Sequence, residues 1–167
     1  RLVSCFRAFE RPVFFTIHAY QDLQREGGLM TAWWSQVCMT RTPESRVAAL
    51  LGAAPEQVFR KFRYSAFSNP SLVASFRRIG VEDLVITGIK TNLCVESTAR
   101  DAFDAGLRTF VVADATAAKT EEFHLTSLKT LAHGFSSIVT TNEAVEKIKQ
   151  WARPQARLAG KREALAS

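Results

Sequence analysis

Two observations predict that the chain folds as a three-layer α/β/α domain of the Rossmann-like type, with a mostly parallel sheet. Short apolar, β-rich runs alternate with segments of helical spacing, a pattern typical of a parallel sheet covered by helices on both faces. The chain has 167 residues, of which 47% are hydrophobic, so it can bury one sizeable core. We therefore expect one domain over residues 1–151, followed by a basic tail over residues 152–167.

The N-terminal part is predicted to contain two helices and one strand. A helix at residues 2–10 is indicated by apolar residues on one face, namely Leu2, Val3, Phe6 and Phe9. The first strand is the apolar run at residues 12–17. A helix at residues 43–51 is expected because Thr42 can cap it before a proline at the first helical position, and Gly52 suits its other end.

From residue 57 onward the alternation is regular. Strands are predicted at residues 57–60, 84–88, 108–113 and 137–140, and helices at residues 70–79, 94–105, 122–133 and 142–151. In the helix at 70–79, Leu72, Phe76 and Ile79 form the core stripe. The run from Leu84 to Thr87 is expected to be buried on both faces, as strands of parallel sheets usually are.

Residues 18–42 form a long irregular connection, and such connections in compact domains are usually functional. Gly27-Gly28 and Trp33-Trp34 stand out in it. Trp33 and Trp34 fit the aromatic wall of a substrate lid and fit ordinary core packing equally well. His18 ends the first strand and is therefore expected to face a site at the carboxyl edge of the sheet.

Cys94 lies where a buried strand, ended by Gly88, passes into a helix that Thr91 or Asn92 can cap. Free N–H groups and the positive end of a helix both stabilise a thiolate over a thiol. Ligands of open α/β sheets also bind outside the carboxyl ends of strands. Cys94 is therefore a candidate nucleophile, whereas Cys5 and Cys38 lack this setting and are expected to fill space.

Three ordered motifs resemble the isochorismatase-like cysteine hydrolases, which include nicotinamidases, N-carbamoylsarcosine amidases and ureidoacrylate amidases. The motifs are KFRYSAF at residues 61–67, GIKTNLCVESTARDA at residues 88–102 and VVADA at residues 111–115. The resemblance covers about residues 2 to 148. It implies that Cys94 attacks the carbonyl carbon of a small amide and that Lys61 is the lysine of the catalytic triad, favouring the thiolate.

The resemblance also implies an oxyanion hole and a substrate pocket. The hole consists of the backbone N–H groups of Lys90 and Cys94, beside a non-proline cis peptide bond at Ile89-Lys90. Besides His18 and the two tryptophans, the expected pocket residues are Arg63, Tyr64, Phe67 and Asn92. We expect no metal and no cofactor, because a nicotinamidase-like zinc site needs a second histidine and a carboxylate nearby, and His124 and His133 are predicted on a distant helix.

The third member of the triad is missing from the sequence. In the family, an aspartate ends a strand that precedes the first helix, whereas this chain begins inside that helix. The resemblance places that strand at the centre of the sheet, between residues 13–17 and 84–87, so we expect a truncated chain with two rows of unpaired backbone groups. Asp114 ends another strand but matches a structural aspartate of the family, so it is not expected to replace the base.

Composition and charge exclude some classes of protein. The net charge of +6 comes partly from the tail, and no basic stripe is interleaved with aromatic residues, so we expect no nucleic-acid partner. Three cysteines without paired spacing and no apolar run near the length of a membrane span favour a cytoplasmic protein that binds no membrane. We expect a homo-oligomer, a dimer or a tetramer.

Three functions are compatible with these features. The first is an amidohydrolase that acts on a small carboxamide or ureido compound through a thioester on Cys94. The second is an isochorismatase-type hydrolase of a vinyl ether, which needs no cysteine nucleophile and is therefore disfavoured by Cys94. The third is a non-catalytic, oligomeric member of the family, supported only by the absent aspartate.

Overall fold

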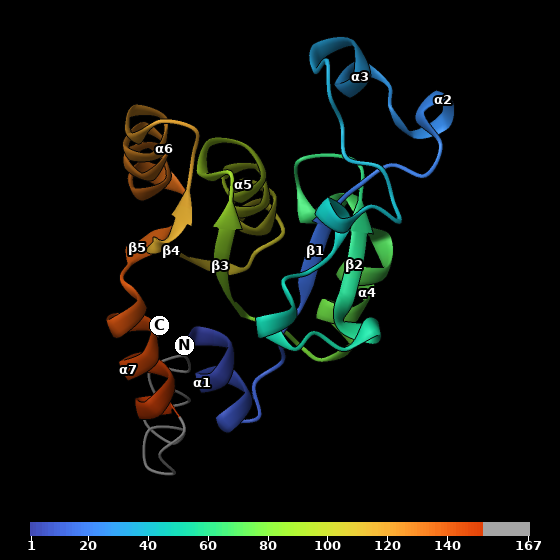
Figure 1. Ribbon diagram of the computed structural model, residues 1–167. Helices are drawn as coiled ribbons and strands as arrows, with labels where there is room; N and C mark the ends of the chain where they lie inside the picture. Colours follow the sequence, from blue (N-terminus) through green and yellow to red (C-terminus); the bar gives the residue numbers. More distant parts are fainter. Residues whose placement is uncertain (152–167) are drawn as a thin grey trace.

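Two parallel sheets form the framework of the computed structural model, which describes residues 1–151 (Figure 1). In the smaller sheet, β1 (Phe15–His18) pairs with β2 (Val58–Lys61). The larger sheet has the order β3 (Asp83–Ile89), β4 (Arg108–Ala117) and β5 (Ser137–Val139). The predicted tail at residues 152–167 lies outside the described residues.

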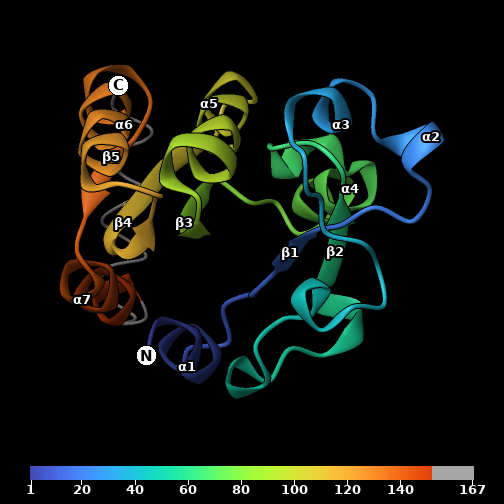
Figure 2. The same ribbon diagram turned by 45° about the horizontal axis from the view of Figure 1, so that its top comes forward.

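The larger sheet has helices on both faces. Because side chains alternate along a strand, Val111 and Val112 of β4 point to opposite faces, and both are fully buried. One face carries Ile86 and Val111 against α5 (Glu96–Asp104) and α6 (Glu121–Gly134). The other carries Val112 and Val139 against α1 (Leu2–Ala8) and α7 (Thr141–Trp151). Figure 2 shows these helix layers on opposite sides of the strands, which confirms the predicted three-layer α/β class.

The smaller sheet packs against α4 (Pro70–Arg78). Asn69 begins this helix, because its side chain accepts a hydrogen bond from the Leu72 N–H at 3.0 Å and donates one to the Arg60 carbonyl at 2.7 Å. Leu72 and Phe76 are buried on the apolar face of the helix, where Phe76 meets Phe14 edge-on at 5.3 Å. Leu84 of β3 packs against this cluster as well as against its own, so an apolar contact joins the two sheets.

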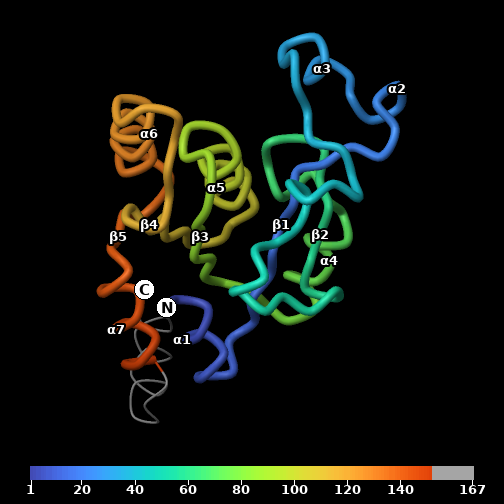
Figure 3. Tube along the Cα trace, viewed as in Figure 1, coloured from blue at the N-terminus to red at the C-terminus, as the bar shows by residue number. Residues whose placement is uncertain are grey.

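Between β1 and β2 the chain makes a long excursion beyond the carboxyl ends of these strands, which Figure 3 shows as the segment carrying α2 (Leu23–Glu26) and α3 (Leu29–Trp33). It returns through three short 3₁₀ turns: η1 (Pro43–Ser45), η2 (Ala49–Leu51) and η3 (Pro55–Gln57). The helix predicted at residues 43–51 is therefore wrong. The Thr42 hydroxyl donates to the Met39 carbonyl instead of capping a helix, although Gly52 has the left-handed conformation expected at such an end, with φ of 54°.

The failure of that helix has a physical reason. Short helices are stabilised mainly by burying an apolar face against the rest of the domain. Leu50, the residue best placed to provide such a face, is 88% exposed. Without that burial the capping signals at Thr42 and Gly52 support only isolated turns.

A cavity of about 1760 Å³ lies between the sheets, lined by all of β1 on one side and all of β3 on the other. Among the described residues, no ladder joins β1 to β3. This edge of β3 is consequently open: only Ile86 is buried in the run from Leu84 to Thr87, and Ile89 is 73% exposed. The prediction that this run is buried on both faces is wrong, because a strand gains that burial only from neighbours on both edges.

Within residues 1–151, no helix combines the length and the hydropathy that crossing a bilayer requires.

The packing of α6 on β4 generates a stability prediction. Leu131 is fully buried in the cluster that contains Val111, so Leu131→Ala should lower the free energy of unfolding by about 2–5 kcal/mol. Leu125 on the same helix is 45% exposed, and Leu125→Ala should cost less than about 1 kcal/mol. Urea unfolding followed by circular dichroism measures both. Similar losses in the two variants would contradict the packing of α6 described above.

Candidate active site

Cys94 lies in a π-helical turn, η5 (Thr91–Val95), which connects β3 to α5. The turn follows a cis peptide bond at Ile89-Lys90, as predicted. The Lys90 carbonyl accepts hydrogen bonds from the N–H groups of Leu93 and Val95 at 3.1 and 3.2 Å. The helical segment therefore begins at residue 91, before the predicted start at residue 94.

Neither predicted cap of this helix is observed. The Thr91 hydroxyl bonds to His124 Nδ1 at 2.9 Å, and no side-chain cap is present at the start of η5. Asn92 Oδ1 is buried without a hydrogen-bond partner among the described residues. Lys90 occupies the N-cap position, so Thr91 and Asn92 lie inside the helical turn and neither is placed to cap it.

The thiol of Cys94 faces the ammonium of Lys61. Lys61 is the last residue of β2 and is only 3% exposed. Its Nζ donates to Cys94 Sγ at 3.3 Å and to the Arg63 carbonyl at 3.0 Å. Burial lowers the pKa of Lys61, and the neighbouring Cys94 sulfur opposes that shift through its charge and hydrogen bond. An ammonium in this position stabilises a thiolate.

The Thr98 side chain holds the backbone of Cys94 in place. Its hydroxyl donates to the Cys94 carbonyl at 2.6 Å and accepts from the Ala66 N–H at 3.0 Å. Ala66 begins the turn η4 (Ala66–Ser68), which follows β2. One buried hydroxyl thus ties the backbone of Cys94 to the segment that carries Lys61.

An aromatic cluster forms the wall of the cavity near Lys61. His18 Nε2 lies 3.0 Å from the Tyr20 hydroxyl, and the His18 and Tyr64 rings meet edge-on at 6.2 Å. The indole N–H of Trp34 donates to the Tyr64 hydroxyl at 2.7 Å, and Lys90 Nζ lies 5.2 Å from the centre of the Trp34 ring. These five side chains line the same cavity as Lys61 and Cys94.

The other predicted pocket residues lie elsewhere. Trp33 is 78% exposed and is not part of the cavity wall. Phe67 packs against Phe76 in the core, with ring centres 5.8 Å apart. Arg63 is exposed and donates to the carbonyls of Glu26 and Phe62, and Asn92 also lies outside the cavity lining. Proximity in sequence to Lys61 or Cys94 did not fix the direction of these side chains.

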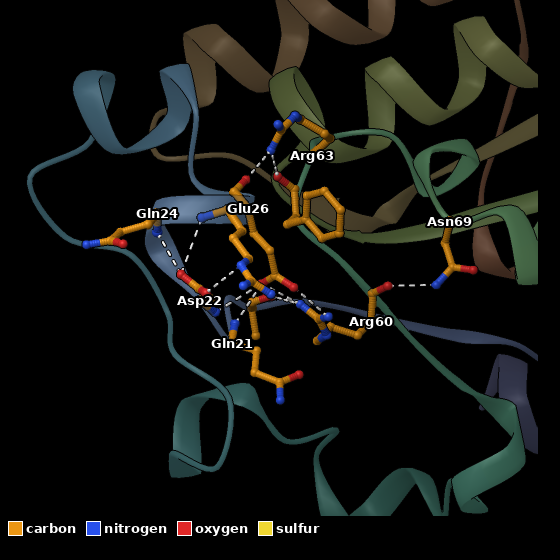
Figure 4. Close-up of polar contacts among 10 residues, drawn as sticks. Gln21, Asp22, Gln24, Glu26, Arg60, Arg63 and Asn69 are labelled. Atoms are coloured by element: carbon orange, nitrogen blue, oxygen red, sulfur yellow. Dashed lines mark hydrogen bonds and ion pairs between the residues drawn. The ribbon is translucent and has the colours of Figure 1, made fainter.

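An ion pair anchors the excursion that carries Trp34 (Figure 4). Arg60 of β2 binds both carboxylate oxygens of Glu26 at 2.8 Å, and the Gln21 N–H donates to the same carboxylate at 2.7 Å. These bonds, led by the one from Arg60, lower the pKa of Glu26 to about 2. Because Arg60 directly precedes Lys61, the same strand, β2, positions the Lys61 ammonium and anchors the excursion.

Tyr20, Thr98 and His124 were not predicted as parts of the site. Tyr20 is 1% exposed. It lies two residues beyond His18, and side chains two residues apart in extended chain point to the same side, so the sequence spacing could have predicted it. His124, predicted on a distant helix, contacts Thr91 of η5 but does not line the cavity. It lies in the first turn of α6, which follows β4, and such a turn begins at the carboxyl edge of the sheet.

The described residues contain no carboxylate in contact with Cys94 or Lys61. The acidic residues lining the cavity are Glu44, Glu82 and Asp83, and the last two pair with Arg108 at the opposite end of β3. Asp114 is exposed and accepts hydrogen bonds from Thr141, so it joins β4 to α7. Within residues 1–151, no group of three His, Cys, Asp or Glu side chains is arranged to hold a metal ion.

Comparison with known proteins gives related sequences. The family model of the isochorismatase domain matches residues 1–143. Nicotinamidase 3 of Arabidopsis thaliana is 36% identical over 132 residues, covering 77% of this chain and 66% of that protein. Enterobactin synthase component B of Escherichia coli (strain K12) is 34% identical over 134 residues, covering 79% of this chain and 47% of that protein. The chain thus spans between about half and two thirds of the length of these relatives.

Solved structures share the fold. A cysteine hydrolase from Pseudomonas syringae pv. phaseolicola 1448A matches with a TM-score of 0.84 at 24% identity, covering 91% of this chain and 78% of that chain. A pyrazinamidase/nicotinamidase from Streptococcus mutans UA159 matches with a TM-score of 0.73 at 27% identity, covering 83% of this chain and 81% of that chain.

The environment of His18 generates a prediction about pH. Burial, with the charges of Lys61 and Arg63, lowers the pKa of His18 to about 4. The unfolded chain binds this proton near pH 6.5, so His18 makes the fold progressively less stable as the pH falls from about 6.5 to about 4. NMR should show an unchanged His18 ring between pH 7 and pH 5, and His18→Gln should remove this part of the pH dependence. A His18 midpoint near pH 6.5 would contradict the burial of its ring.

Proposed function

Since the chain belongs to the isochorismatase family, we propose that it is a cysteine-dependent amidohydrolase that cleaves a small carboxamide or ureido compound. The observation that carries the proposal is the contact of 3.3 Å between Lys61 Nζ and Cys94 Sγ at one end of the cavity. A buried ammonium beside a thiol is the arrangement that activates a sulfur nucleophile. Similarity to Nicotinamidase 3 supports an amide as the bond that is cleaved.

In the proposed reaction, the Cys94 thiolate attacks the carbonyl carbon of the amide. The negative charge that develops on the carbonyl oxygen is stabilised by the backbone N–H groups of Lys90 and Cys94. The C–N bond breaks, a proton passes to the leaving nitrogen, and ammonia or an amine departs. Water then attacks the thioester, which releases a carboxylic acid and restores the thiolate.

A proton must be moved in both steps, and we propose that a carboxylate placed between β1 and β3 moves it. The open edges of these strands face one cavity, and its carboxyl end contains Lys61 and Cys94. A strand inserted there would satisfy the unpaired backbone groups of both edges and would place its last side chain at the thiol. Activity is expected only in a polypeptide that supplies such a strand.

A vinyl ether hydrolase of the isochorismatase type is the second candidate. Its specific support is the similarity to Enterobactin synthase component B, together with 29% identity over 136 residues to a protein named "Probable isochorismatase" from Pseudomonas chlororaphis. This chemistry proceeds by acid catalysis and needs no sulfur nucleophile. Substitution of Cys94 therefore separates the two candidates.

The first functional prediction concerns Cys94. In an active polypeptide, Cys94→Ala should reduce ammonia release from an amide panel by at least about 10³-fold, because it removes the nucleophile and little volume. Cys5→Ala is the matched control, since Cys5 lies on α1 and outside the cavity lining, and it should retain activity. Retained ammonia release in Cys94→Ala would exclude covalent catalysis by Cys94, whereas wild-type protein that releases no ammonia but hydrolyses a vinyl ether would favour the second candidate.

The second functional prediction concerns Lys61. Lys61→Met keeps the apolar stem but removes the charge that favours the thiolate, so activity near neutral pH should fall by about 10²-fold. The loss should shrink as the pH rises toward about 9, where an ordinary thiol ionises unaided. Lys129→Met, at an exposed position of α6, controls for the change in net charge. A loss that is independent of pH would assign Lys61 to proton transfer or positioning.

A further inference from the structure

The side chain of His124 lies behind the turn that carries Cys94. Its Nδ1 lies 2.9 Å from the hydroxyl of Thr91, the first residue of η5, and either group can donate in this hydrogen bond. Thr91 is fully buried. Lys90 and Cys94 line the cavity, whereas Thr91 and His124 do not. The groups assigned to catalysis therefore lie on the front of η5, and the bond between Thr91 and His124 lies on its back.

The turn η5 has little support of its own. It is five residues long, and no side chain caps its start. The Lys90 carbonyl accepts from the N–H groups of Leu93 and Val95 and passes over that of Cys94 between them. Such widely spaced backbone bonds are typical of single π-helical turns, which are rare and often occur at functional sites. Since so short a helical segment is stabilised mainly by packing, its peptide groups depend on neighbouring elements for their orientation.

The helix α6 is fixed independently of the His124 side chain. Thr120 caps its first turn, and the Thr120 carbonyl accepts from the His124 N–H at 3.1 Å. Leu131 is fully buried in the core cluster. The Ser127 hydroxyl also donates to the carboxylate of Glu96 on α5. Replacing the His124 ring should therefore release Thr91 without displacing the helix.

The two ends of η5 are attached to different parts of the domain. Thr98 ties the Cys94 carbonyl to the turn that follows β2. His124 instead holds Thr91, which shares a peptide unit with Lys90. Loss of the first attachment would disturb the thiol, whereas loss of the second would disturb the backbone beside Lys90.

We propose that His124 is a positioning residue of the active site: acting through Thr91, it orients the backbone of η5 so that the N–H groups of Lys90 and Cys94 stabilise the developing oxyanion. This inference rests on the proposed function, because it concerns the same thiol and the same attack on a carbonyl. His124 does not line the cavity, so it does not act on the substrate directly. Its contribution should appear in reactions that form an oxyanion at Cys94, and only in those.

Two reagents separate this contribution from the reactivity of the thiol. With p-nitrophenyl acetate, the Cys94 thiolate attacks the ester carbonyl, an oxyanion forms, and nitrophenolate leaves with the electron pair of the broken C–O bond. With iodoacetamide, the same thiolate displaces iodide from a saturated carbon, so no oxyanion forms. The ratio of the acylation rate to the alkylation rate therefore measures stabilisation of the oxyanion. Mass spectrometry of the peptide that contains Cys94 gives both rates.

We expect His124→Leu to lower this ratio by about 5- to 20-fold, less than the loss of an oxyanion donor, because the N–H groups remain but are no longer held in one orientation. The alkylation rate, which follows the thiolate, should change by less than about 2-fold. Thr91→Val removes the hydroxyl at nearly constant volume and should cause the same loss. Since both changes break one bond, the double variant should be no worse than either single variant.

Conservative variants should restore the ratio. His124→Asn can place an amide nitrogen or oxygen near the position of Nδ1, and Thr91→Ser keeps the hydroxyl, so both should recover most of it. His133→Leu, at an exposed position of the same helix, is the matched control and should leave the ratio unchanged.

Four results would overturn the proposal. The first is an unchanged ratio in His124→Leu. The second is an equal fall in acylation and alkylation, which would indicate a loss of thiolate or of folded protein. The third is a loss in the double variant that multiplies the two single losses, because the side chains would then act separately. The fourth is a failure of His124→Asn and Thr91→Ser to recover the ratio.

The outcome can be told apart from that of the proposed function. Nitrophenolate leaves without taking up a proton, so the ratio can be measured whether or not a polypeptide releases ammonia. A ratio that depends on His124 in a protein whose Cys94→Ala variant still releases ammonia would retain the positioning role and remove covalent amide catalysis. A ratio insensitive to His124 in a protein that loses ammonia release with Cys94→Ala would retain the amidohydrolase and remove the positioning role.

Discussion

The buried ammonium of Lys61 determines how the two sheets meet at the candidate site. An ammonium withdrawn from water costs several kcal/mol unless hydrogen bonds compensate it, and Lys61 is 3% exposed. Its partners are the Arg63 carbonyl, two residues along the chain, and the Cys94 sulfur, which follows a strand of the other sheet. In the described part of the chain the sheets share no ladder, so this contact and the Thr98 bridge align their carboxyl ends.

Two further contacts join the sheets beside the Lys61–Cys94 pair. Leu84 joins the apolar clusters of both sheets, and the Thr98 hydroxyl joins the Cys94 carbonyl to Ala66. These contacts lie on the side of the strands where α4 and α5 pack. Within residues 1–151, only the cavity lies between β1 and β3. The position of Cys94 is therefore set by contacts on one face of the strands.

The sequence predicted the parts of the fold and site that depend on local pattern. Every predicted strand is present. Cys94 was predicted at a strand-to-helix junction and Lys61 at the end of a strand, and the two side chains meet in the structure. What failed depended on long-range burial. The helix at residues 43–51 lacked a surface to bury Leu50, and Phe67, adjacent in sequence to the site, turned toward Phe76. The pairing of Trp34 with Lys90 follows from how the excursion folds back, which no local spacing encodes.

The distribution of charge along the cavity constrains what can fill it. Its amino end contains Glu82 and Asp83, both paired with Arg108, whereas its carboxyl end contains Lys61 and Lys90 without carboxylate partners among the described residues. A strand that runs parallel to β1 and β3 would bring its last residue to the cationic end. An aspartate or glutamate there is stabilised by Lys61, and a lysine or arginine is repelled. Because the walls of the cavity are largely apolar, the strand proposed to fill it would carry apolar side chains and would end in an acid.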